Sequence, residues 1–203
     1  MAADISTILS TTCTRRVLEL CDMDEKNLEK CKKTCKRVQA FIGKFLILVN
    51  AVDQKLHLLI NDKYHCSYTV STAKKGEGQE IKSGRTPLGL HLIKKKIGEG
   101  ADPLAIFQSR INTKEKAPLN RLSDHIVARI LRLDGLQERY NKGLNSEGTL
   151  VDSYQRYIYI HGTNEIQKIG KPASKGCIRL HPIDMIDLFD QVVTSTLVYI
   201  YAD

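Results

Sequence analysis

The sequence predicts a mainly β domain, a β-sandwich or a β-rich α+β fold, preceded by an N-terminal α-helical hairpin. Two observations support this prediction. Up to Phe41, apolar residues recur every three or four positions, which is the spacing of a helix face. From Lys44 onward they alternate with polar residues or form short runs between turn residues, which is typical of strands. We therefore assign residues 1–42 to the hairpin and residues 43–203 to the β-rich domain.

The hairpin is expected to contain two helices, Ile5–Cys21 and Asp24–Phe41, with Asp24 as the N-cap of the second. Four of the six cysteines lie in it: Cys13, Cys21, Cys31 and Cys35. The nested pairs Cys21–Cys31 and Cys13–Cys35 are geometrically natural in an antiparallel hairpin, although four cysteines allow three pairings. The alternative is four reduced thiols that line a helix contact. A zinc site fits less well, because no Cys-x2-Cys spacing or histidine partner is present at ligand spacing.

The β-rich domain is expected to alternate short strands with longer loops. The expected strands are Phe45–Val49, Lys55–Ile60, Tyr64–Val70, Leu88–Ile93, Ala105–Gln108, His125–Leu133, Arg156–Ile160 and Thr196–Tyr201. A helix should begin at Pro182 and end near Val192. The expected loops are Lys74–Arg85, Asn112–Asp124 and Gly135–Asp152. These loops either fold over an active site as a lid or are insertions without such a role.

The charge of the chain is basic, with 31 Lys and Arg against 23 Asp and Glu and a net charge of +8. A basic protein attracts polyanions, of which nucleic acid and an acidic bacterial cell wall are two candidates. The chain has no Trp, and its eight Tyr are not interleaved with basic residues in a nucleic-acid motif. We therefore treat the charge as general surface character and expect no nucleic-acid partner.

No segment predicts stable membrane insertion. The longest apolar stretch, Val38–Val52, is interrupted by Gln39 and Lys44 and is too short to span a bilayer. Residues 1–12 lack the basic region and long apolar run of a secretory signal.

Two short segments hold the residues that carry chemistry. The first, His161-Gly162-Thr163, follows the expected strand Arg156–Ile160, and the second runs from Ser174 to Arg179 with Cys177 in a glycine-flanked turn. Fifteen residues separate the histidine from the cysteine, which is enough for a loop and a return, so the two side chains can meet. A thiol beside an imidazole is the minimal apparatus of nucleophilic acyl transfer.

Each residue of this pattern has a physical role. Only a thiolate attacks efficiently, and His161 can take the proton of Cys177. Gly176 lets the backbone approach a substrate without a Cβ clash, and the amides of Gly176 and Cys177 can face a developing oxyanion. Arg179 can share the strand face of Cys177 and add positive charge. The alternative, an inert core cysteine and a buried histidine, is disfavoured by the flanking glycines.

The pattern His-Gly-Thr, then Ser-x-Gly-Cys-Ile-Arg, with fifteen residues between the histidine and the cysteine, resembles the signature of the L,D-transpeptidases with a YkuD-type catalytic domain. The segments Tyr68–Ala73 and Thr86–Gly89 resemble a second feature of that family, a strand and loop followed by Thr-Pro-x-Gly. The resemblance extends from Lys44 to the end of the chain and implies a mainly β catalytic domain.

The resemblance also implies a role for each matching residue. Cys177 falls on the nucleophile, His161 on its base, and Gly162 on the residue whose carbonyl orients that base. The other residues of the second segment are expected to bind substrate: Ser174, Lys175, Gly176 and Arg179.

One position departs from the family signature, because Lys175 stands where a second histidine is usual. An unperturbed lysine titrates near ~10.4, so we expect its ammonium to supply a constant positive charge near the thiolate. The alternative is that Lys175 points into solvent and contributes nothing.

The function implied by the resemblance is cysteine-dependent acyl transfer on peptidoglycan stem peptides, for cell-wall cross-linking or remodelling. No cofactor or metal is implied, and His57, His65, His91, His125 and His181 share no metal-ligand spacing. Carbapenem-type inhibitors are expected to acylate Cys177. Two alternatives stay open: a hydrolytic L,D-carboxypeptidase or endopeptidase that uses the same site, and a non-catalytic wall-binding module.

The resemblance further implies a periplasmic or cell-envelope location. An oxidising compartment outside the cytoplasm permits disulfides, so within that interpretation the two hairpin disulfides are favoured over free thiols.

Overall fold

The computed structural model describes residues 22–119 and 124–203, and in this part of the chain the fold is mainly β with two α-helices, as expected. In chain order the elements are α1 (Asp22–Arg37), β1 (Phe45–Asn50), β2 (Lys55–Ile60), β3 (Lys63–Ser71), β4 (Gly89–Ile97), β5 (Ala105–Gln108), β6 (Ile111–Lys116), β7 (Ile126–Gly135), β8 (Tyr159–Thr163), the 3₁₀ turn Ile166–Lys168, β9 (Ile178–Leu180), α2 (Pro182–Gln191) and β10 (Leu197–Tyr201).

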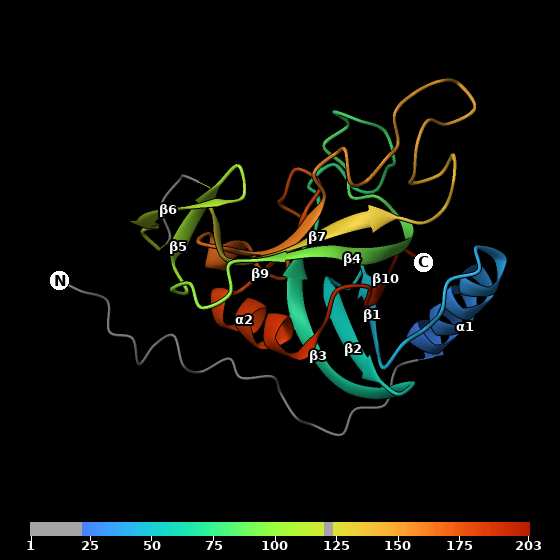
Figure 1. Cartoon of the computed structure of the whole chain (residues 1–203), viewed down its shortest axis with the longest axis horizontal. Coiled ribbons are helices and arrows are strands. Elements are labelled where there is room, and N and C mark those ends of the chain that lie inside the picture. The colour runs from blue at the N-terminus through green and yellow to red at the C-terminus, as the bar shows by residue number, and fades with distance from the viewer. Residues whose placement is uncertain (1–21, 120–123) are drawn as a thin grey trace.

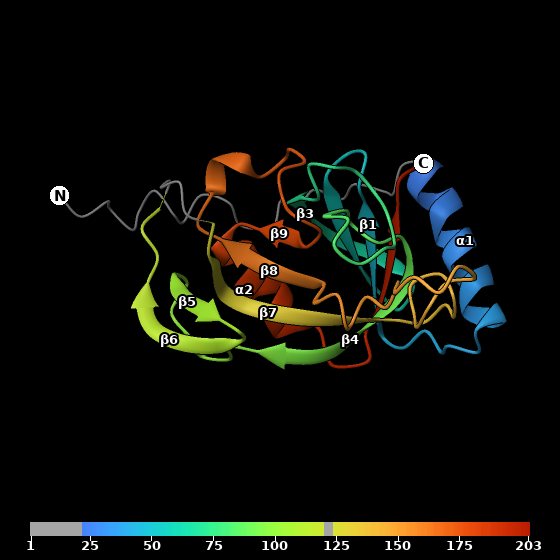
Figure 2. The same cartoon turned by 90° about the horizontal axis from the view of Figure 1, so that it is seen from above.

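The ten strands of the described residues form one sheet in the order β4-β10-β1-β2-β3-β9-β8-β7-β5-β6. A further pairing between β4 and β7 closes the strands from β4 to β7 into a barrel-like ring and leaves the β5–β6 hairpin as an extension. Figures 1 and 2 show this hairpin at one end of the molecule and α1 at the other. Most strand pairs are antiparallel, but β1 and β10 run parallel, and so do β8 and β9.

The main core fills the space between the sheet and α2, which contacts β7 and β8. Strand β1 shows how the sequence builds two layers. Ile47 and Val49 point into this core, whereas Leu46 and Leu48 point to the opposite face, under α1. A strand covered on both faces needs a continuous apolar run, which is why Phe45–Val49 was identifiable as a buried strand.

Helix α1 packs on that second face through one stripe that includes Leu28, Cys31 and Cys35. Asp24 was expected as an N-cap, but it lies inside the helix and is buried. Its carboxylate accepts hydrogen bonds from Tyr201 and from Asn50 (3.2 Å), so tertiary partners replace the capping role.

One expected loop and one expected strand were assigned wrongly, for different reasons. Strand β6 lies in the segment expected to be a loop, because its polar sequence belongs to an exposed edge strand with a single strand neighbour. Strand β8 begins at Tyr159 and not at Arg156. Residues 152–157 form turns, and Tyr157 has a left-handed backbone (φ +58°), so the alternating pattern there is not a strand.

The expected first helix, with Cys13 and Cys21, lies outside the described residues. Cys31 and Cys35 carry free thiols, and their Sγ atoms lie 4.0 Å apart on one face of α1. Each of the two nested disulfides needs a partner outside the described residues, so both stay predictions.

Candidate active site

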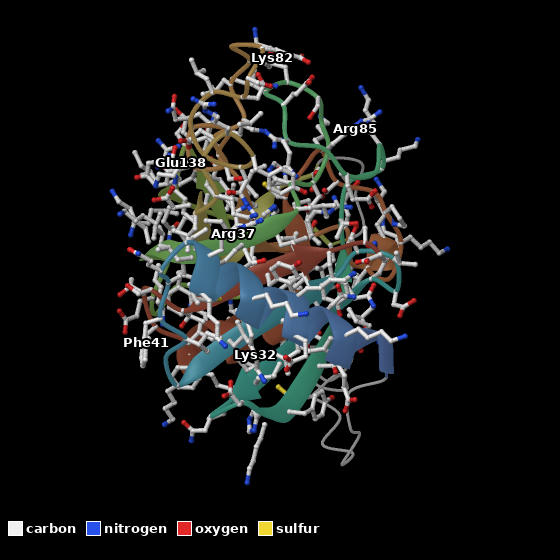
Figure 3. The ribbon with its side chains drawn as sticks, turned by 90° about the vertical axis from the view of Figure 1, so that its right-hand side faces the viewer. Lys32, Arg37, Phe41, Lys82, Arg85 and Glu138 are labelled. Atoms are coloured by element: carbon white, nitrogen blue, oxygen red, sulfur yellow. The ribbon has the colours of Figure 1, made fainter. Side chains whose placement is uncertain are left out.

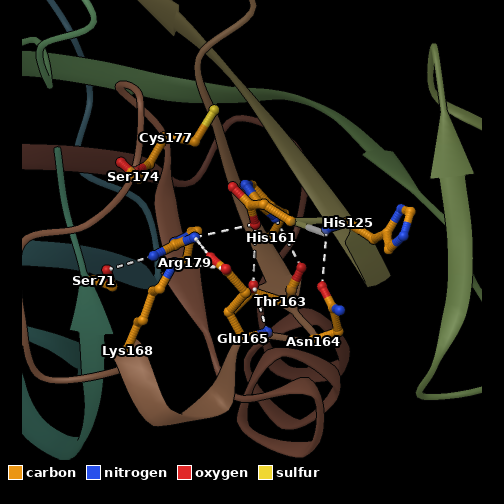
Figure 4. Close-up of polar contacts among 12 residues, drawn as sticks. Ser71, His125, His161, Thr163, Asn164, Glu165, Lys168, Ser174, Cys177 and Arg179 are labelled. Carbon is orange, nitrogen blue, oxygen red and sulfur yellow. Dashed lines mark hydrogen bonds and ion pairs between the residues drawn. The ribbon is translucent and has the colours of Figure 1, made fainter. Parts of the chain in front are cut away.

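The two segments that carry the expected chemistry lie on neighbouring strands. In the parallel β8–β9 pair, His161 is opposite Arg179 and Ile160 is opposite Ile178. Because side chains alternate along a strand, His161 and Arg179 project from the same face. Cys177 directly precedes β9, two residues before Arg179, and therefore lies at the strand end on that face (Figure 4). His161 itself lies inside β8 and not after a strand end as expected.

Cys177 is half-buried, and its Sγ atom lies 3.5 Å from the carbonyl oxygen of Tyr157. Burial raises the pKa of this thiol to about 11, while the backbone amide of Tyr159 and the guanidinium groups of Arg179 and Arg156 favour the thiolate. At neutral pH the side chain is therefore a thiol, and it needs a base to become a nucleophile.

The His161 imidazole is buried, with 4% of the residue exposed. Its Nδ1 lies 2.8 Å from the carbonyl oxygen of Gly162, so Nδ1 carries the proton and donates it. Nε2 is then the acceptor nitrogen. Burial lowers the pKa of His161 to about 4, which keeps the ring neutral at pH 7 and able to take a proton.

Gly162 is fixed by its neighbour strand. A β-bulge between Val127 and Ile130 bends β7 across this part of β8. A Cβ atom at residue 162 would lie 2.7 Å from the carbonyl oxygen of Val127, closer than such contacts occur. Only glycine fits, and its carbonyl is thereby held beside the imidazole that it orients.

The loop of residues 174–177, which we call the nucleophile loop, is held in place by its own serine. The Ser174 hydroxyl donates to the carbonyl of Cys177 (2.6 Å) and accepts from the amide of Gly176 (3.1 Å). The amide of Gly176 was expected to face an oxyanion, but in this structure it is engaged by Ser174. Gly176 has a φ of +133°, a backbone conformation that favours glycine. Ser174 is buried, so its contacts position Cys177.

Thr86 is a second support for this loop and carried no role in the sequence analysis. Its hydroxyl accepts from the amide of Ala73 (3.0 Å) and donates to the carbonyl of Gly176 (3.0 Å). The Thr-Pro-x-Gly segment that contains it was recognised, but the contact with Gly176 crosses 90 positions of sequence. A local pattern does not reveal such a contact.

Arg179 is the centre of a buried polar network, drawn in Figure 4. It is 1% exposed, and its Nη1 lies 3.0 Å from Glu165 and 3.1 Å from Asp124. Its Nη2 donates to the hydroxyl of Ser71 (3.1 Å). Two carboxylates and a hydroxyl therefore occupy a guanidinium that was expected to bind substrate. This geometry fits a residue that positions β9 and the nucleophile at its start.

Arg156 ties the loop of residues 74–85 to the site, and sequence reasoning gave it no role. Its guanidinium donates to the carbonyls of Gly78 (3.1 Å), Gln79 (2.6 Å) and Arg85 (2.7 Å). All three acceptors are neutral, so its positive charge is not cancelled by them. Lys175, by contrast, is exposed at the edge of the site.

Within residues 22–119 and 124–203, no group of three or more His, Cys, Asp or Glu residues is arranged to hold a metal ion. Three of the remaining histidines have structural contacts, and His57 is one of them, between the Ser67 hydroxyl (2.9 Å) and the Asp24 carboxylate (3.3 Å). His91 lies between the Gly89 carbonyl and the Ser153 hydroxyl, and His181 accepts the Ile183 amide at the start of α2. Nor does either described helix reach the length and apolarity that a bilayer crossing requires.

The family model described as the L,D-transpeptidase catalytic domain (YkuD) matches residues 44–200. Over 46 residues the chain is 54% identical to YkuD of Bacillus subtilis (strain 168), a protein named as an L,D-transpeptidase; this covers 23% of the chain and 28% of YkuD. YqjB of the same organism, named likewise, is 42% identical over 48 residues, or 24% of the chain and 27% of YqjB.

The solved structures that are similar to this chain include an L,D-transpeptidase from Mycobacterium smegmatis, with 15% identity and a TM-score of 0.47. The L,D-transpeptidase LdtMt1 in complex with imipenem has 16% identity and a TM-score of 0.47. In both comparisons 78% of this chain and 59% of the other are covered. The chain thus spans less than two thirds of each of these relatives.

Proposed function

Because the chain belongs to the L,D-transpeptidase catalytic-domain family, we propose that it is a cysteine acyltransferase that acts on peptidoglycan stem peptides. The observation that best supports this proposal is the pairing of β8 and β9. It brings Cys177 and His161 to one face of the sheet, with the imidazole oriented by the Gly162 carbonyl. The family match alone establishes the fold and the class of catalytic domain, and the reaction is our proposal.

The proposed reaction starts from a neutral thiol and a neutral imidazole. As Sγ of Cys177 attacks the carbonyl carbon that precedes a terminal D-residue, its proton passes to Nε2 of His161. When the carbon–nitrogen bond breaks, the departing amine takes that proton, and a thioester remains on Cys177. The amine of a second stem peptide then attacks the thioester, gives its proton to His161, and Cys177 leaves and is reprotonated. No cofactor is required in this scheme.

The supporting residues fix the geometry of these steps. Ser174 and Thr86 hold the loop that presents Cys177, and Arg179 holds the strand that follows it. Fixed positions matter because bringing the reacting groups together in advance removes much of the entropic barrier to acyl transfer. We propose that Ser174, Gly176 and Arg179 serve positioning, and that the exposed Lys175 is the member of this segment that meets the substrate.

The decisive experiment is mass spectrometry of purified peptidoglycan fragments after incubation with the protein. Cross-linked dimers that form with the wild type and not with Cys177→Ala would support the transferase. Trimmed stems without dimers would identify the hydrolytic alternative, in which water resolves the thioester. Unchanged fragments would contradict both and favour a wall-binding module.

We also propose that a carbapenem acylates Cys177, as a thiol nucleophile would allow, and that the protein acts in the cell envelope. Intact-mass analysis after incubation with imipenem should show one adduct. Peptide mapping should place it on Cys177, and an adduct on Cys31, Cys35 or Cys66 would contradict this assignment.

A further inference from the structure

A groove of about 700 Å³ opens beside the nucleophile. It is formed by the loop of residues 74–84, the segment 155–158 and the segment 173–175. Two of its residues also contact Cys177: the Tyr157 carbonyl lies 3.5 Å from Sγ, and the Ser174 hydroxyl bonds to the Cys177 carbonyl. A chain joined to Cys177 as a thioester can therefore extend directly into the groove.

All the charged side chains that line this groove are positive. Its charged side chains are Lys74, Lys75, Lys82, Arg156 and Lys175, and no Asp or Glu lines it. The ion pairs found among the described residues include none of the four lysines, and Arg156 bonds only to neutral oxygens. We call this groove the lysine groove.

The acidic residues of the same loop do not line the groove. Glu80 lines an adjoining hollow with Arg139 and Tyr140, which shares Lys75 with the groove, and Glu77 lines neither hollow. In Figure 3 the loop that carries Lys82 and Arg85 lies at the top of the view, above α1, which crosses its middle. The charged side chains that line the groove beside the nucleophile are therefore all positive.

The floor of the lysine groove is apolar. Ile81, Tyr157, Ile158 and Ala173 line it, and Tyr157 is 52% exposed. An apolar floor under a cationic rim fits a ligand with methylene groups and a free carboxylate. The four bonds of Arg156 to the loop of residues 78–85 hold the rim in place before a ligand arrives.

We propose that the lysine groove is a subsite for a carboxylate-bearing arm of the peptide that acylates Cys177. This inference rests on the proposed function and adds the residues that select an acidic peptide. Exposed ion pairs contribute modestly and are screened by salt. Loss of three lysines should therefore weaken binding about 10-fold at low salt, with a smaller effect at high salt.

The test measures peptide binding to the full chain carrying Cys177→Ala, which removes the chemistry. Two fluorescent tetrapeptides serve as probes, one with a free side-chain carboxylate at its third residue and one with a carboxamide there. In fluorescence anisotropy the combined change Lys74→Met, Lys75→Met and Lys82→Met should weaken the carboxylate peptide about 10-fold and the carboxamide peptide less than about 2-fold. Arginine at the same three positions should preserve binding.

The matched control is Lys33→Met, Lys36→Met and Lys95→Met, which removes the same charge from exposed positions on α1 and β4. It should leave both affinities unchanged. Equal affinity for the two peptides, or equal weakening by the control, would overturn the subsite. Turnover of both peptides by the wild type with equal KM would also overturn it while sparing the proposed function. Selective binding without any turnover would support the groove and count against the function.

Discussion

At the scale of single residues, Cys177 and His161 are both neutral at pH 7, since burial shifts their pKa values to about 11 and about 4. The imidazole is therefore available as a base across the neutral range. Cys177→Ala should abolish turnover, and His161→Ala should reduce it by several orders of magnitude, because nucleophile and base act as one unit. Dimer formation from stem peptides measures this. Cys66→Ala, which removes a core thiol far along the chain, should keep turnover, and a fully active Cys177→Ala would refute the nucleophile.

The pH dependence follows from the same two residues. Below pH about 4 His161 becomes protonated and cannot accept the thiol proton, so turnover should fall there and not near 6.5. Turnover measured from pH 3.5 to 7.5 checks this. A midpoint of the acid limb near 6.5 would show that the imidazole is solvated during the reaction.

The charge that favours the Cys177 thiolate comes from Arg179 and Arg156, while Lys175 is exposed to solvent. Arg156→Met should therefore raise the apparent pKa of Cys177 alkylation by iodoacetamide, because a nearby cation is lost. Lys175→Met should leave it unchanged, since water screens an exposed ammonium. An increase in Lys175→Met as large as that in Arg156→Met would restore the electrostatic role expected from the sequence.

At the scale of the secondary-structure elements, Arg179 connects β9 with the turn after β8 through Glu165 and with Asp124 before β7. Arg179→Gln leaves the buried carboxylate of Glu165 without its guanidinium partner and should lower the free energy of unfolding by about 3 kcal/mol. Urea unfolding measures it.

The double variant Arg179→Gln with Glu165→Gln should recover part of that loss, because the buried carboxylate that lost its guanidinium partner, and keeps only Lys168, is removed as well. If the double variant lost more free energy of unfolding than the two single variants lost together, the buried ion pair would not be the cause.

Thr86 connects the loop after β3 with the nucleophile loop. Thr86→Val keeps the shape but removes both hydrogen bonds, which should cost about 2 kcal/mol of stability and reduce kcat through a displaced Gly176 carbonyl. Thr86→Ser keeps the hydroxyl and should restore most of kcat. A Thr86→Val protein with unchanged kcat would show that the loop holds its shape without this contact.

The elements also show what the sequence can predict. The apolar run of β1 and the proline start of α2 were predictable because burial and capping leave local patterns. The motif around Cys177 was predictable because its residues are adjacent in sequence. Thr86 and Arg156 were not, because they act on backbone carbonyls more than 70 positions away. The true start of β8 was missed because the left-handed Tyr157 interrupts an otherwise strand-like pattern.

At the scale of the whole molecule, buried histidines set part of the stability in acid. His91 is fully buried, and burial lowers its pKa to about 4. Between pH 6.5 and 4 the unfolded chain binds a proton that the folded chain excludes, so the free energy of unfolding falls as the pH falls. For His91 alone this loss should approach about 3 kcal/mol.

The check compares the wild type with His91→Gln by urea unfolding at pH 7 and pH 4.5. The variant should lose less stability between these two pH values. Asp184, whose pKa burial raises to about 7, contributes with the opposite sign but is present in both proteins, so the difference isolates His91. Equal losses in the two proteins would mean that His91 becomes protonated without unfolding.

The ring closure between β4 and β7 has a consequence for how the molecule behaves at high concentration. Closure removes one open margin of the sheet, and β6 remains as the last strand in the order. An unpaired edge strand can form hydrogen bonds with a strand of a second copy, which leads to aggregation. Three charged residues are exposed along β6: Lys114, Glu115 and Lys116. Pairing with an incoming strand would remove their charges from water, which costs free energy. The polar sequence of this strand thus protects the protein from self-association. Replacing these residues with valine would let β6 pair with a strand of a second copy.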